Sequence, residues 1–353
     1  MSAGKLLIRA DANVAIGTGH IMRCLALSQA WQDAGGHCIF AMAEVTPALE
    51  QRLQEEGMEV RHIVADPGGD RDAAETASIA ARSNCDWIAV DGYHFGANYQ
   101  SILKNSDCRL LFLDDNGHAE HYYADLVLNQ NPHAHEGLYV SREPYTQLLL
   151  GAQFVMLRRE FEPWREWERT IPPFGRRILV TMGGSDPDNL TLLAIEALKR
   201  EIARDLDATV VVGGSNPHSG LLESKVSENL GSIRLEQNVT HMPDLMAGAD
   251  IALVAAGGTL WELLFMGCSV LSYARDSAQW KIISEFDAQG VVQDLGHSRS
   301  ADPTSLAEAI MELAKSRVRR RKMSALGRQR VDGRGAGRIC ERLMTHAVRN
   351  LQS

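Results

Sequence analysis

The sequence lacks the features of secreted, disulfide-rich and membrane-spanning chains. Its six cysteines are scattered, with no CxxC or Cys/His ligand spacing, which predicts reduced thiols in a cytoplasmic protein. The N-terminus has no long apolar core of the kind found in signal peptides. The most apolar stretch, residues 251–274, is interrupted by Glu262 and by two adjacent glycines. It therefore fits a buried strand–helix–strand unit better than a membrane span.

Positive charge and metal-ligand clusters are also scarce. The formal net charge is −9, so no global positive field attracts a nucleic acid, and we expect none as a partner. An acidic chain can still bind one nucleotide, because that requires only a local group of backbone N–H donors. The histidine pairs His118/His121 and His133/His135 lie in polar segments without a third ligand, so we expect neither a metal ion nor another cofactor.

Short apolar runs alternate with helical patterns, which is typical of α/β proteins with parallel, doubly wound sheets. The 353 residues suffice for two domains. We predict an N-terminal Rossmann-like domain over 1–157, a linker over 158–176, and a C-terminal Rossmann-like domain over 177–353 that ends in helices. The basic run 317–322 in those helices is interpreted as a solvated face. The expected strands are 5–11, 37–42, 60–64, 86–93, 109–115, 125–130 and 147–152, then 176–184, 208–214, 232–239, 249–257 and 269–274.

A glycine-rich loop after the first expected strand is the strongest local feature. Gly17, Thr18 and Gly19 precede a predicted helix that begins near His20. The glycines let a ligand approach the backbone closely, and the N–H groups of the helix start favour an anion. His20 is a candidate general base, since a neutral imidazole can accept a proton. The alternative is a dinucleotide-binding fold in which His20 only packs, but the third glycine of that fingerprint falls on Met22.

A second loop of this kind lies in the second half of the chain. Gly183 and Gly184 end the expected strand 176–184, and Ser185 directly follows it. They are candidates for lining a ligand site, since α/β sheets bind ligands outside the carboxyl ends of their strands. Asp186, followed by Pro187, is explained without a ligand as a helix N-cap.

A third loop has two interpretations. Gly257 and Gly258 precede a helix that Thr259 is expected to open, with Glu262 in its first turn. Thr259 and Glu262 have the spacing of a capping box, which accounts for both without a ligand. Alternatively, the N–H groups of the helix start hold a diphosphate while Glu262 accepts hydrogen bonds from ribose hydroxyls. We favour the second interpretation, because an acid within so apolar a segment needs partners.

Eight motifs occur in order along nearly the whole chain: RADANVAIGTGHIMRCLALS, VDGYHF, LDDNGH, ADLVLNQN, LLLGAQFVMLRREF, LVTMGGSDPDN, AGGTLWELLFMG and VDGRGAGRI. Together they resemble the UDP-2,4-diacetamido-2,4,6-trideoxy-β-L-altropyranose hydrolase family of pseudaminic acid biosynthesis and the related spore-coat polysaccharide proteins. Both groups are similar to the GT-B-fold N-acetylglucosaminyltransferase that completes lipid II. The resemblance implies a GT-B architecture, in which two Rossmann-like domains with parallel sheets face each other across a cleft and the C-terminal domain holds UDP.

The same resemblance implies roles for individual residues. His20 matches the family's loop histidine, which activates the attacking water, and Glu262 matches the acid that binds the uridine ribose. Asp91 is also explained as a cap of the turn that follows it. The other substrate-binding residues implied by matching motifs are Gly17, Thr18, Gly19, Asp91, Tyr93, His94, Asp115, Asn131, Gly183, Gly184, Ser185, Gly257, Gly258, Thr259 and Gln279, with Asp114 and Asn129 placed beside them.

Three functions are compatible with these observations. The first is hydrolysis of a UDP-activated amino or deoxy sugar, in which His20 activates water, the water attacks the anomeric carbon, and UDP leaves without help from a metal. The second is a glycosyltransferase with the same donor site, in which a sugar or peptide hydroxyl replaces water. The third is a nucleotide-sugar sensor or a nicotinamide enzyme, which the presence of His20 and the missing third glycine disfavour. We expect a monomeric cytoplasmic hydrolase that supplies nonulosonic-acid or surface-polysaccharide synthesis.

Overall fold

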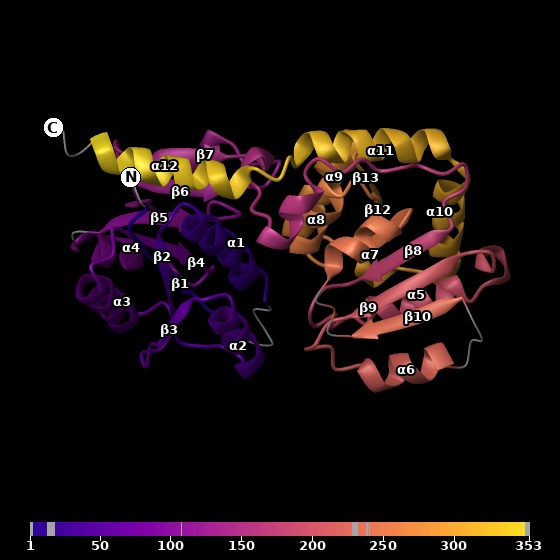
Figure 1. Ribbon diagram of the computed structural model, residues 1–353, viewed down its shortest axis with the longest axis horizontal. Coiled ribbons are helices and arrows are strands. Elements are labelled where there is room, and N and C mark those ends of the chain that lie inside the picture. The colour runs from indigo at the N-terminus through magenta and orange to yellow at the C-terminus, as the bar shows by residue number, and fades with distance from the viewer. Residues whose placement is uncertain are drawn as a thin grey trace. The chain divides into compact units, whose positions relative to one another are not determined.

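The computed structural model describes residues 3–12, 18–106, 108–227, 232–237, 239 and 241–349. The chain forms two compact units: unit 1 comprises Met1–Arg159 and Gly333–Ser353, and unit 2 comprises Glu160–Asp332 (Figure 1). This division differs from the sequence-based one at both boundaries. Residues 160–176, expected in a linker, belong to unit 2, and the last helix, expected in the C-terminal domain, belongs to unit 1.

Unit 1 is built on a seven-stranded parallel sheet with the strand order β3-β2-β1-β4-β5-β6-β7. All seven runs predicted to be strands in this half form strands, since most are apolar enough to be buried between layers of helices. The strand order reverses between β1 and β4, and α/β sheets bind ligands at such switch points. The strands are β1 (Lys5–Ala10), β2 (His37–Met42), β3 (Glu59–His62), β4 (Trp87–Asp91), β5 (Arg109–Leu113), β6 (Leu126–Asn129) and β7 (Gln147–Leu150).

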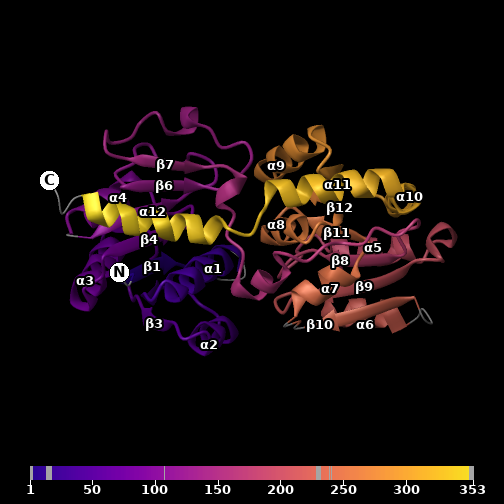
Figure 2. The ribbon, with the colours of Figure 1, turned by 45° about the horizontal axis from the view of Figure 1, so that its top comes forward.

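Helices cover both faces of this sheet. On one face α1, α2 and α12 contribute to a core that includes Leu25, Leu53 and Ile339. On the other face α3 and α4 contribute to a core that includes Ile79 and Tyr99. Figure 2 shows α12 running alongside α1, against which it packs. The helices are α1 (Gly19–Asp33), α2 (Pro47–Glu55), α3 (Asp70–Ser83), α4 (Ala97–Lys104) and α12 (Gly335–Arg349), with the short 3-10 helices η1 (Glu136–Tyr139) and η2 (Ala152–Phe154).

The start of α12 packs so closely against the rest of unit 1 that only glycine fits there. A Cβ on Gly335 would lie 2.1 Å from the carbonyl oxygen of Val155, whereas a Cβ on Gly337 in the same helix would meet no atom within 4 Å. We expect Gly335→Ala to lower the free energy of unfolding by about 1–3 kcal/mol, because the backbone must shift. The matched variant Gly337→Ala should be neutral or stabilising by up to about 1 kcal/mol. Urea denaturation measures both, and equal effects would contradict this packing.

Unit 2 contains a six-stranded parallel sheet with the order β10-β9-β8-β11-β12-β13. The sequence predicts five of these strands, and the α/β class with two parallel sheets is confirmed. The edge strand β13 is not predicted, because its sequence VQDLGH is short of apolar residues and only partly buried. The strands are β8 (Arg177–Thr181), β9 (Asp207–Val212), β10 (Ile233–Gln237), β11 (Ile251–Ala255), β12 (Ser269–Ala274) and β13 (Val292–His297).

Helices also pack against the sheet of unit 2. On one face α5 and α10 contribute Ile195 and Ile310 to a core that contains Val180 and Leu253 of the central strands. No helix within the described ranges is long and apolar enough to cross a membrane. The helices are η3 (Arg159–Trp164), α5 (Leu190–Leu198), η4 (Glu201–Ala203), α6 (Ser219–Ser227), α7 (Met242–Gly248), α8 (Gly258–Phe265), α9 (Ser277–Ala288), η5 (Ser298–Ser300), α10 (Pro303–Lys315) and α11 (Arg317–Arg330).

The basic run 317–322 at the start of α11 is only partly the solvated face that the sequence suggests. Arg320 is fully buried and donates to the carbonyl oxygens of Pro172 at 2.9 Å and Pro173 at 3.0 Å. Arg317 donates to the carbonyl oxygen of Ile171 at 2.9 Å. Backbone carbonyls that would otherwise lack partners are satisfied in this way, so part of the basic character holds the segment before β8 against α11.

Candidate active site

The candidate catalytic side chains gather at the carboxyl ends of neighbouring strands in unit 1. His20 is the second residue of α1, the helix after β1, and Asp91 is the last residue of β4, which pairs with β1. Asp115 follows β5, and Asn131 follows β6, the next two strands of the sheet. Parallel strands end at the same edge of a sheet, so segments distant in the sequence meet where the strand order reverses.

His20 and Asp91 form a hydrogen-bonded pair. The Nδ1 atom of His20 lies 2.6 Å from Oδ1 of Asp91, and the two residues are only 9% and 1% exposed. An ionised carboxylate only accepts hydrogen bonds, so Nδ1 carries the proton and Nε2 keeps its lone pair. Nε2 is then the nitrogen that can take a proton, and the carboxylate stabilises the imidazolium that results. The pair has the geometry of a general base with the acid that orients it.

Arg23, which the sequence analysis does not single out, binds two carboxylates of the site. Its guanidinium donates to both oxygens of Asp91 at 2.6 Å and to those of Asp115 at 2.8 and 3.0 Å. Its Nη2 atom also lies 3.2 Å from Nδ1 of His20. The contact between Nδ1 of His20 and Oδ1 of Asp91 is shorter, at 2.6 Å, and it requires the proton on Nδ1. His20 and Arg23 are three residues apart and therefore share a face of α1. This spacing is the signal that would have identified Arg23.

The charge of Arg23 keeps both carboxylates ionised. Burial on its own would raise the pKa of Asp91, but the adjacent Arg23 and His20 hold that pKa well below its usual range. Burial opposes ionisation of Asp115 as well, and Arg23 again lowers the pKa of that carboxyl. The carboxylate beside His20 is therefore negatively charged throughout the neutral pH range, as an orienting acid must be.

Asp115 also connects Tyr93 and Asn131 to the site. The Tyr93 hydroxyl donates to Oδ2 of Asp115 at 2.9 Å, and Nδ2 of Asn131 donates to Oδ1 at 2.9 Å. Burial raises the pKa of Tyr93, and the charge of Asp115 raises it further, so the hydroxyl stays protonated. Tyr93 as a whole residue is 55% exposed, and its ring lies edge-on to that of His20, with 5.0 Å between ring centroids. We call His20, Arg23, Asp91, Tyr93, Asp115 and Asn131 the unit 1 site.

Two other sequence-based candidates have partners outside this group. Nε2 of His94 lies 3.3 Å from Oδ2 of the buried Asp11. Asp114 accepts hydrogen bonds from the backbone of Asn116 at 2.7 Å and from the Tyr122 hydroxyl, so it shapes the turn after β5. In the structure Asp114 therefore has a different role from the adjacent Asp115, and the sequence alone does not distinguish the two. Binding of substrate by His94 stays a prediction.

The loop before α1 is described only in part, and Gly17 lies outside the described residues. Thr18 immediately precedes α1, and Gly19 is the first residue of the helix. No side chain of a described residue caps this helix start, and a Cβ on Gly19 would meet no atom within 4 Å. An uncapped helix start retains N–H donors that can bind an anion. Binding of substrate by Thr18 and Gly19 remains a prediction.

The loop after β8 in unit 2 is shaped by close contact between two backbones. Gly183 has a φ of 86°, which favours glycine. A Cβ on Gly213, after β9, would lie 2.4 Å from the carbonyl oxygen of Gly184. The expected N-cap position of Asp186 is wrong, because α5 begins at Leu190 and its N-cap residue is Asn189. The Asp186 carboxylate nevertheless accepts hydrogen bonds of 2.9 Å from each of the first two amides of α5. Binding of a ligand by Gly183, Gly184 and Ser185 stays a prediction.

The loop after β11 differs from expectation in how its helix begins. The first residue of α8 is Gly258, and Gly257 precedes it. Thr259 is therefore not the cap residue, and Glu262 lies in the second turn rather than the first, which removes the capping-box explanation. A Cβ on either glycine would meet no atom within 4 Å, so the helix start is open. Gln279, in the first turn of α9, accepts a hydrogen bond of 3.1 Å from the backbone of Arg275.

The described residues contain no group of three or more His, Cys, Asp or Glu side chains that could hold a metal ion. The six cysteines are buried and free of disulfides. One of them, Cys24, donates to Oδ2 of Asp91 at 3.4 Å. Burial raises the pKa of the Cys24 thiol well above its usual range, and the charge of Asp91 contributes to that rise. Cys24 is consequently a supporting donor to Asp91 rather than a nucleophile.

The sequence has distant relatives, although no known family model matches it. An uncharacterised protein of Methanocaldococcus jannaschii is 23% identical over 288 residues, which are 80% of this chain but only 58% of that protein. The spore coat polysaccharide biosynthesis protein SpsG of Bacillus subtilis is 26% identical over 247 residues, 68% of this chain and 70% of SpsG. The UDP-2,4-diacetamido-2,4,6-trideoxy-β-L-altropyranose hydrolase of Campylobacter jejuni is 23% identical over 267 residues, 74% of this chain and 88% of the hydrolase. The homologues of this chain thus include the proteins that its motifs resemble.

Solved structures share its fold over nearly the whole chain. MurG of Acinetobacter baumannii has a TM-score of 0.64 at 14% identity and is matched over 97% of this chain and 99% of MurG. HepE of Anabaena, solved in complex with UDP-glucose, has a TM-score of 0.60 at 14% identity over 97% of this chain and 99% of HepE. At such identities the likeness establishes the fold, and it confirms the predicted GT-B class.

Proposed function

We propose that this chain hydrolyses a UDP-activated amino or deoxy sugar, with His20 as the general base. The observation that carries the proposal is the 2.6 Å contact between Nδ1 of His20 and Oδ1 of Asp91. This contact leaves the lone pair of Nε2 for a proton. Two comparisons support it: one homologue is named as a UDP-sugar hydrolase, and a protein of the same fold was solved with UDP-glucose.

In the proposed reaction the water oxygen attacks C1 of the sugar while Nε2 of His20 takes a proton from the water. The bond between C1 and the diphosphate oxygen breaks, and its electron pair leaves with UDP. Asp91 stabilises the imidazolium until the proton passes to solvent. Arg23 supports this step indirectly, because it keeps Asp91 ionised.

We assign the UDP part of the substrate to unit 2. The open start of α8 offers N–H donors and the positive end of a helix dipole, both suited to a diphosphate. Donors aimed at the departing diphosphate also stabilise the charge that develops on it. Glu262 accepts hydrogen bonds from the ribose hydroxyls in this proposal. The remaining substrate contacts proposed are Gly17, Thr18, Gly19, Tyr93, His94, Asp115 and Asn131 in unit 1, and Gly183, Gly184, Ser185, Gly257, Gly258, Thr259 and Gln279 in unit 2.

A glycosyltransferase is the second candidate function. The fold is shared with MurG, and one homologue is named for spore coat polysaccharide biosynthesis. The same imidazole would then take its proton from a sugar or peptide hydroxyl instead of water. The donor site would be unchanged, so the two reactions differ only in the nucleophile.

The two functions are separated by measuring UDP release from a panel of UDP-sugars in buffer alone and with candidate acceptors. The hydrolase predicts UDP release in buffer alone, with the free sugar as the second product. Release that depends on an added acceptor would instead establish the transferase. No release under either condition, from a folded protein, would contradict both.

Glu262→Gln tests the assignment of the ribose. We expect the variant to bind UDP about tenfold more weakly, because a charged acceptor of ribose hydroxyls is lost. Binding of 2′-deoxy-UDP should change less, since that ligand lacks one of those hydroxyls. Isothermal titration with both nucleotides measures the difference. The matched control is Glu285→Gln, an exposed residue of α9, and equal losses in the two variants would argue against the assignment.

A further inference from the structure

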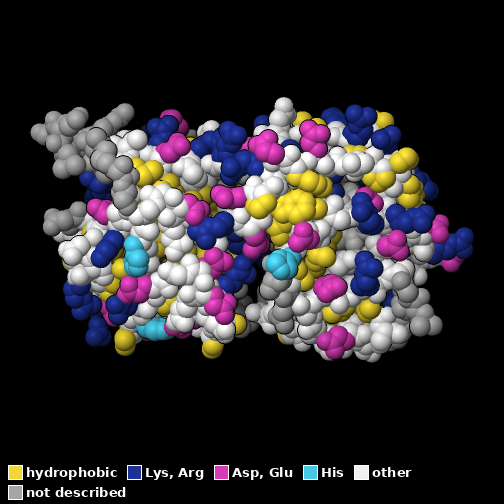
Figure 3. Space-filling view, viewed as in Figure 1, with side chains coloured by type: hydrophobic (Ala, Val, Ile, Leu, Met, Phe, Trp, Pro, Cys, Tyr) yellow, Lys and Arg dark blue, Asp and Glu magenta, His cyan; other side chains and the backbone are white. Residues whose placement is uncertain are grey.

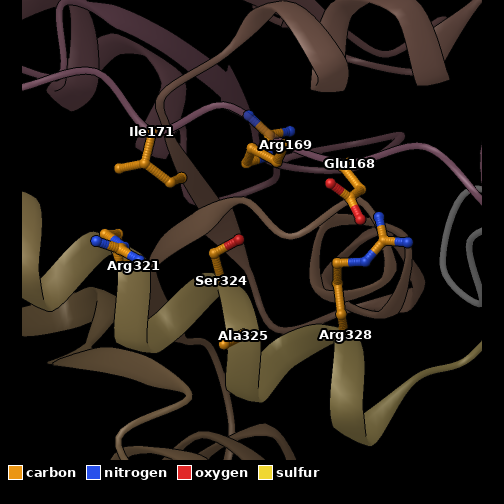
Figure 4. Close-up of a pocket in the computed structure, with 7 residues that line it drawn as sticks. All are labelled: Glu168, Arg169, Ile171, Arg321, Ser324, Ala325 and Arg328. Carbon is orange, nitrogen blue, oxygen red and sulfur yellow. The ribbon is translucent and has the colours of Figure 1, made fainter.

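A groove of about 250 Å³ lies between α11 and the segment that precedes β8, within unit 2 (Figure 4). On the face of unit 2 shown in Figure 3, basic and acidic side chains are interspersed. The groove differs from this pattern, because three arginines and one carboxylate line it. Its lining residues are Glu168, Arg169 and Ile171 from the segment before β8, and Arg321, Ser324, Ala325 and Arg328 from α11.

One of the three arginines, Arg169, uses its guanidinium to hold backbone segments of unit 2 together. Arg169 donates to the carbonyl oxygens of Met266 at 2.8 Å and Met246 at 2.6 Å, and also to that of Ala249. These carbonyls lie at the ends of α7 and α8, where helices have unsatisfied acceptors. Arg169 therefore contributes charge to the groove but few remaining donors.

Arg321 and Arg328 retain donors for a ligand. Arg321 is exposed, and no hydrogen bond or ion pair holds its guanidinium within the described part of the chain. Arg328 donates through Nη2 to the carbonyl oxygen of Arg165 at 2.9 Å. Its Nη1 atom is buried and has no partner among the described residues. A buried donor without a partner costs free energy, so this atom is suited to an acceptor that the described residues do not supply.

The positions on α11 place these donors on one face of the helix. Arg321, Ser324 and Arg328 are three and four residues apart, which is the spacing of neighbours on a helix surface. Figure 4 shows the two guanidinium groups on either side of the Ser324 hydroxyl. Glu168 lies beside Arg328 in the same view and neutralises part of its charge. Three cations against one carboxylate still leave the groove positively charged.

We propose that this groove is a binding site for an oxyanion, with phosphate as the chemical class. Arg321 and Nη1 of Arg328 donate to the anion, and the Ser324 hydroxyl donates a third hydrogen bond. Guanidinium groups match the geometry of phosphate oxygens through paired N–H donors. The site is separate from the residues proposed to bind UDP, and it does not depend on the proposed reaction. The phosphate is either a free ion or the headgroup of an anionic lipid.

The test compares two variants, Arg321→Glu and Lys322→Glu, which change the charge of the protein by the same amount. Lys322 is an exposed neighbour of Arg321 that does not line the groove. Inorganic phosphate is titrated calorimetrically into each full-length protein, with UDP present to occupy a substrate site. We expect Arg321→Glu to weaken phosphate affinity about tenfold or more, and Lys322→Glu by about twofold or less. Equal weakening by both variants, or no saturable phosphate binding by the wild type together with no vesicle binding, would overturn the proposal.

A second arm distinguishes the source of the phosphate. Flotation with vesicles of phosphatidylglycerol and phosphatidylcholine is compared with flotation on phosphatidylcholine alone. Binding to the anionic vesicles that is lost in Arg321→Glu and retained in Lys322→Glu identifies a lipid headgroup as the ligand. Calorimetric binding without flotation identifies a free phosphate. Ser324→Ala keeps every charge and should weaken binding in the assay, calorimetry or flotation, in which the wild type binds. An unchanged affinity would show that Ser324 does not belong to the site.

Discussion

Replacing His20 with alanine is expected to lower the rate of UDP release by about 10²- to 10⁴-fold, the usual contribution of a general base. In the proposed reaction the imidazole takes the proton from water, and Asp91 cannot replace it because Arg23 keeps that carboxylate strongly ionised and paired. The affinity for UDP should stay near the wild-type value, since the nucleotide is assigned to unit 2. Initial rates of UDP release at saturating substrate measure the effect.

The control for this variant is His62→Ala. His62 lies on β3 of the same unit, and its side chain is 60% exposed beside Glu50. Its loss should leave the rate unchanged. Added imidazole should restore part of the activity of His20→Ala, because a free base can enter the vacated space. A His20→Ala enzyme that is folded and as active as the wild type would remove His20 from the mechanism, whichever nucleophile is used.

Arg23→Met is expected to destabilise unit 1 by about 3–5 kcal/mol, because it leaves two buried carboxylates without a compensating charge. The side chain of Asp91 is fully buried, and that of Asp115 is mostly buried. The loss corresponds to a fall in melting temperature of roughly 10 °C for a domain of this size. The matched control is Arg61→Met, whose side chain is 61% exposed beside Glu59, and which should change stability by less than about 1 kcal/mol.

The loss of stability of Arg23→Met relative to the wild type should become smaller as the pH falls from 7 to 5. In the wild type the folded-state pKa values of Asp91 and Asp115 are depressed. Their stabilising effect is therefore present above the unfolded-state pKa, about 4, and is lost only below it. In the variant, burial raises these pKa values, so protonation at pH 5 relieves the uncompensated charge. A deficit that is constant between pH 7 and pH 5 would contradict the proposed role of Arg23.

Most of the fold was predictable from the sequence because parallel buried strands are encoded by local apolar runs. β13 was not, since an edge strand such as Val292–His297 is only partly buried and its residues resemble a loop. The return of α12 to unit 1 was also not predictable, because it depends on a tertiary contact: Gly335 lies directly against the backbone of Val155. Local propensity carries no information about which sheet a terminal helix packs against.

The candidate site was predictable only at its strand ends and helix starts. His20, Asp91 and Asp115 stand at the ends of strands or beside a glycine loop, where patterns can be read. Arg23 lies inside a helix, and its function arises from two carboxylates that are 68 and 92 residues away in the sequence. The distinction between Asp114 and Asp115 likewise depends on their hydrogen-bond partners, which are Tyr122 for Asp114 and Arg23 for Asp115. Such pairings exist only in the folded chain.

The central claim is that water attacks the anomeric carbon of a UDP-sugar. It is tested most directly by running the reaction in ¹⁸O-labelled water and measuring the masses of the UDP and the free sugar by mass spectrometry. Attack at C1 breaks the bond between carbon and oxygen, so the account predicts UDP of unchanged mass and a free sugar that carries the label. The sugar is analysed immediately, before its anomeric oxygen exchanges with solvent. Label in the phosphate of the nucleotide product would show attack at phosphorus and contradict the account.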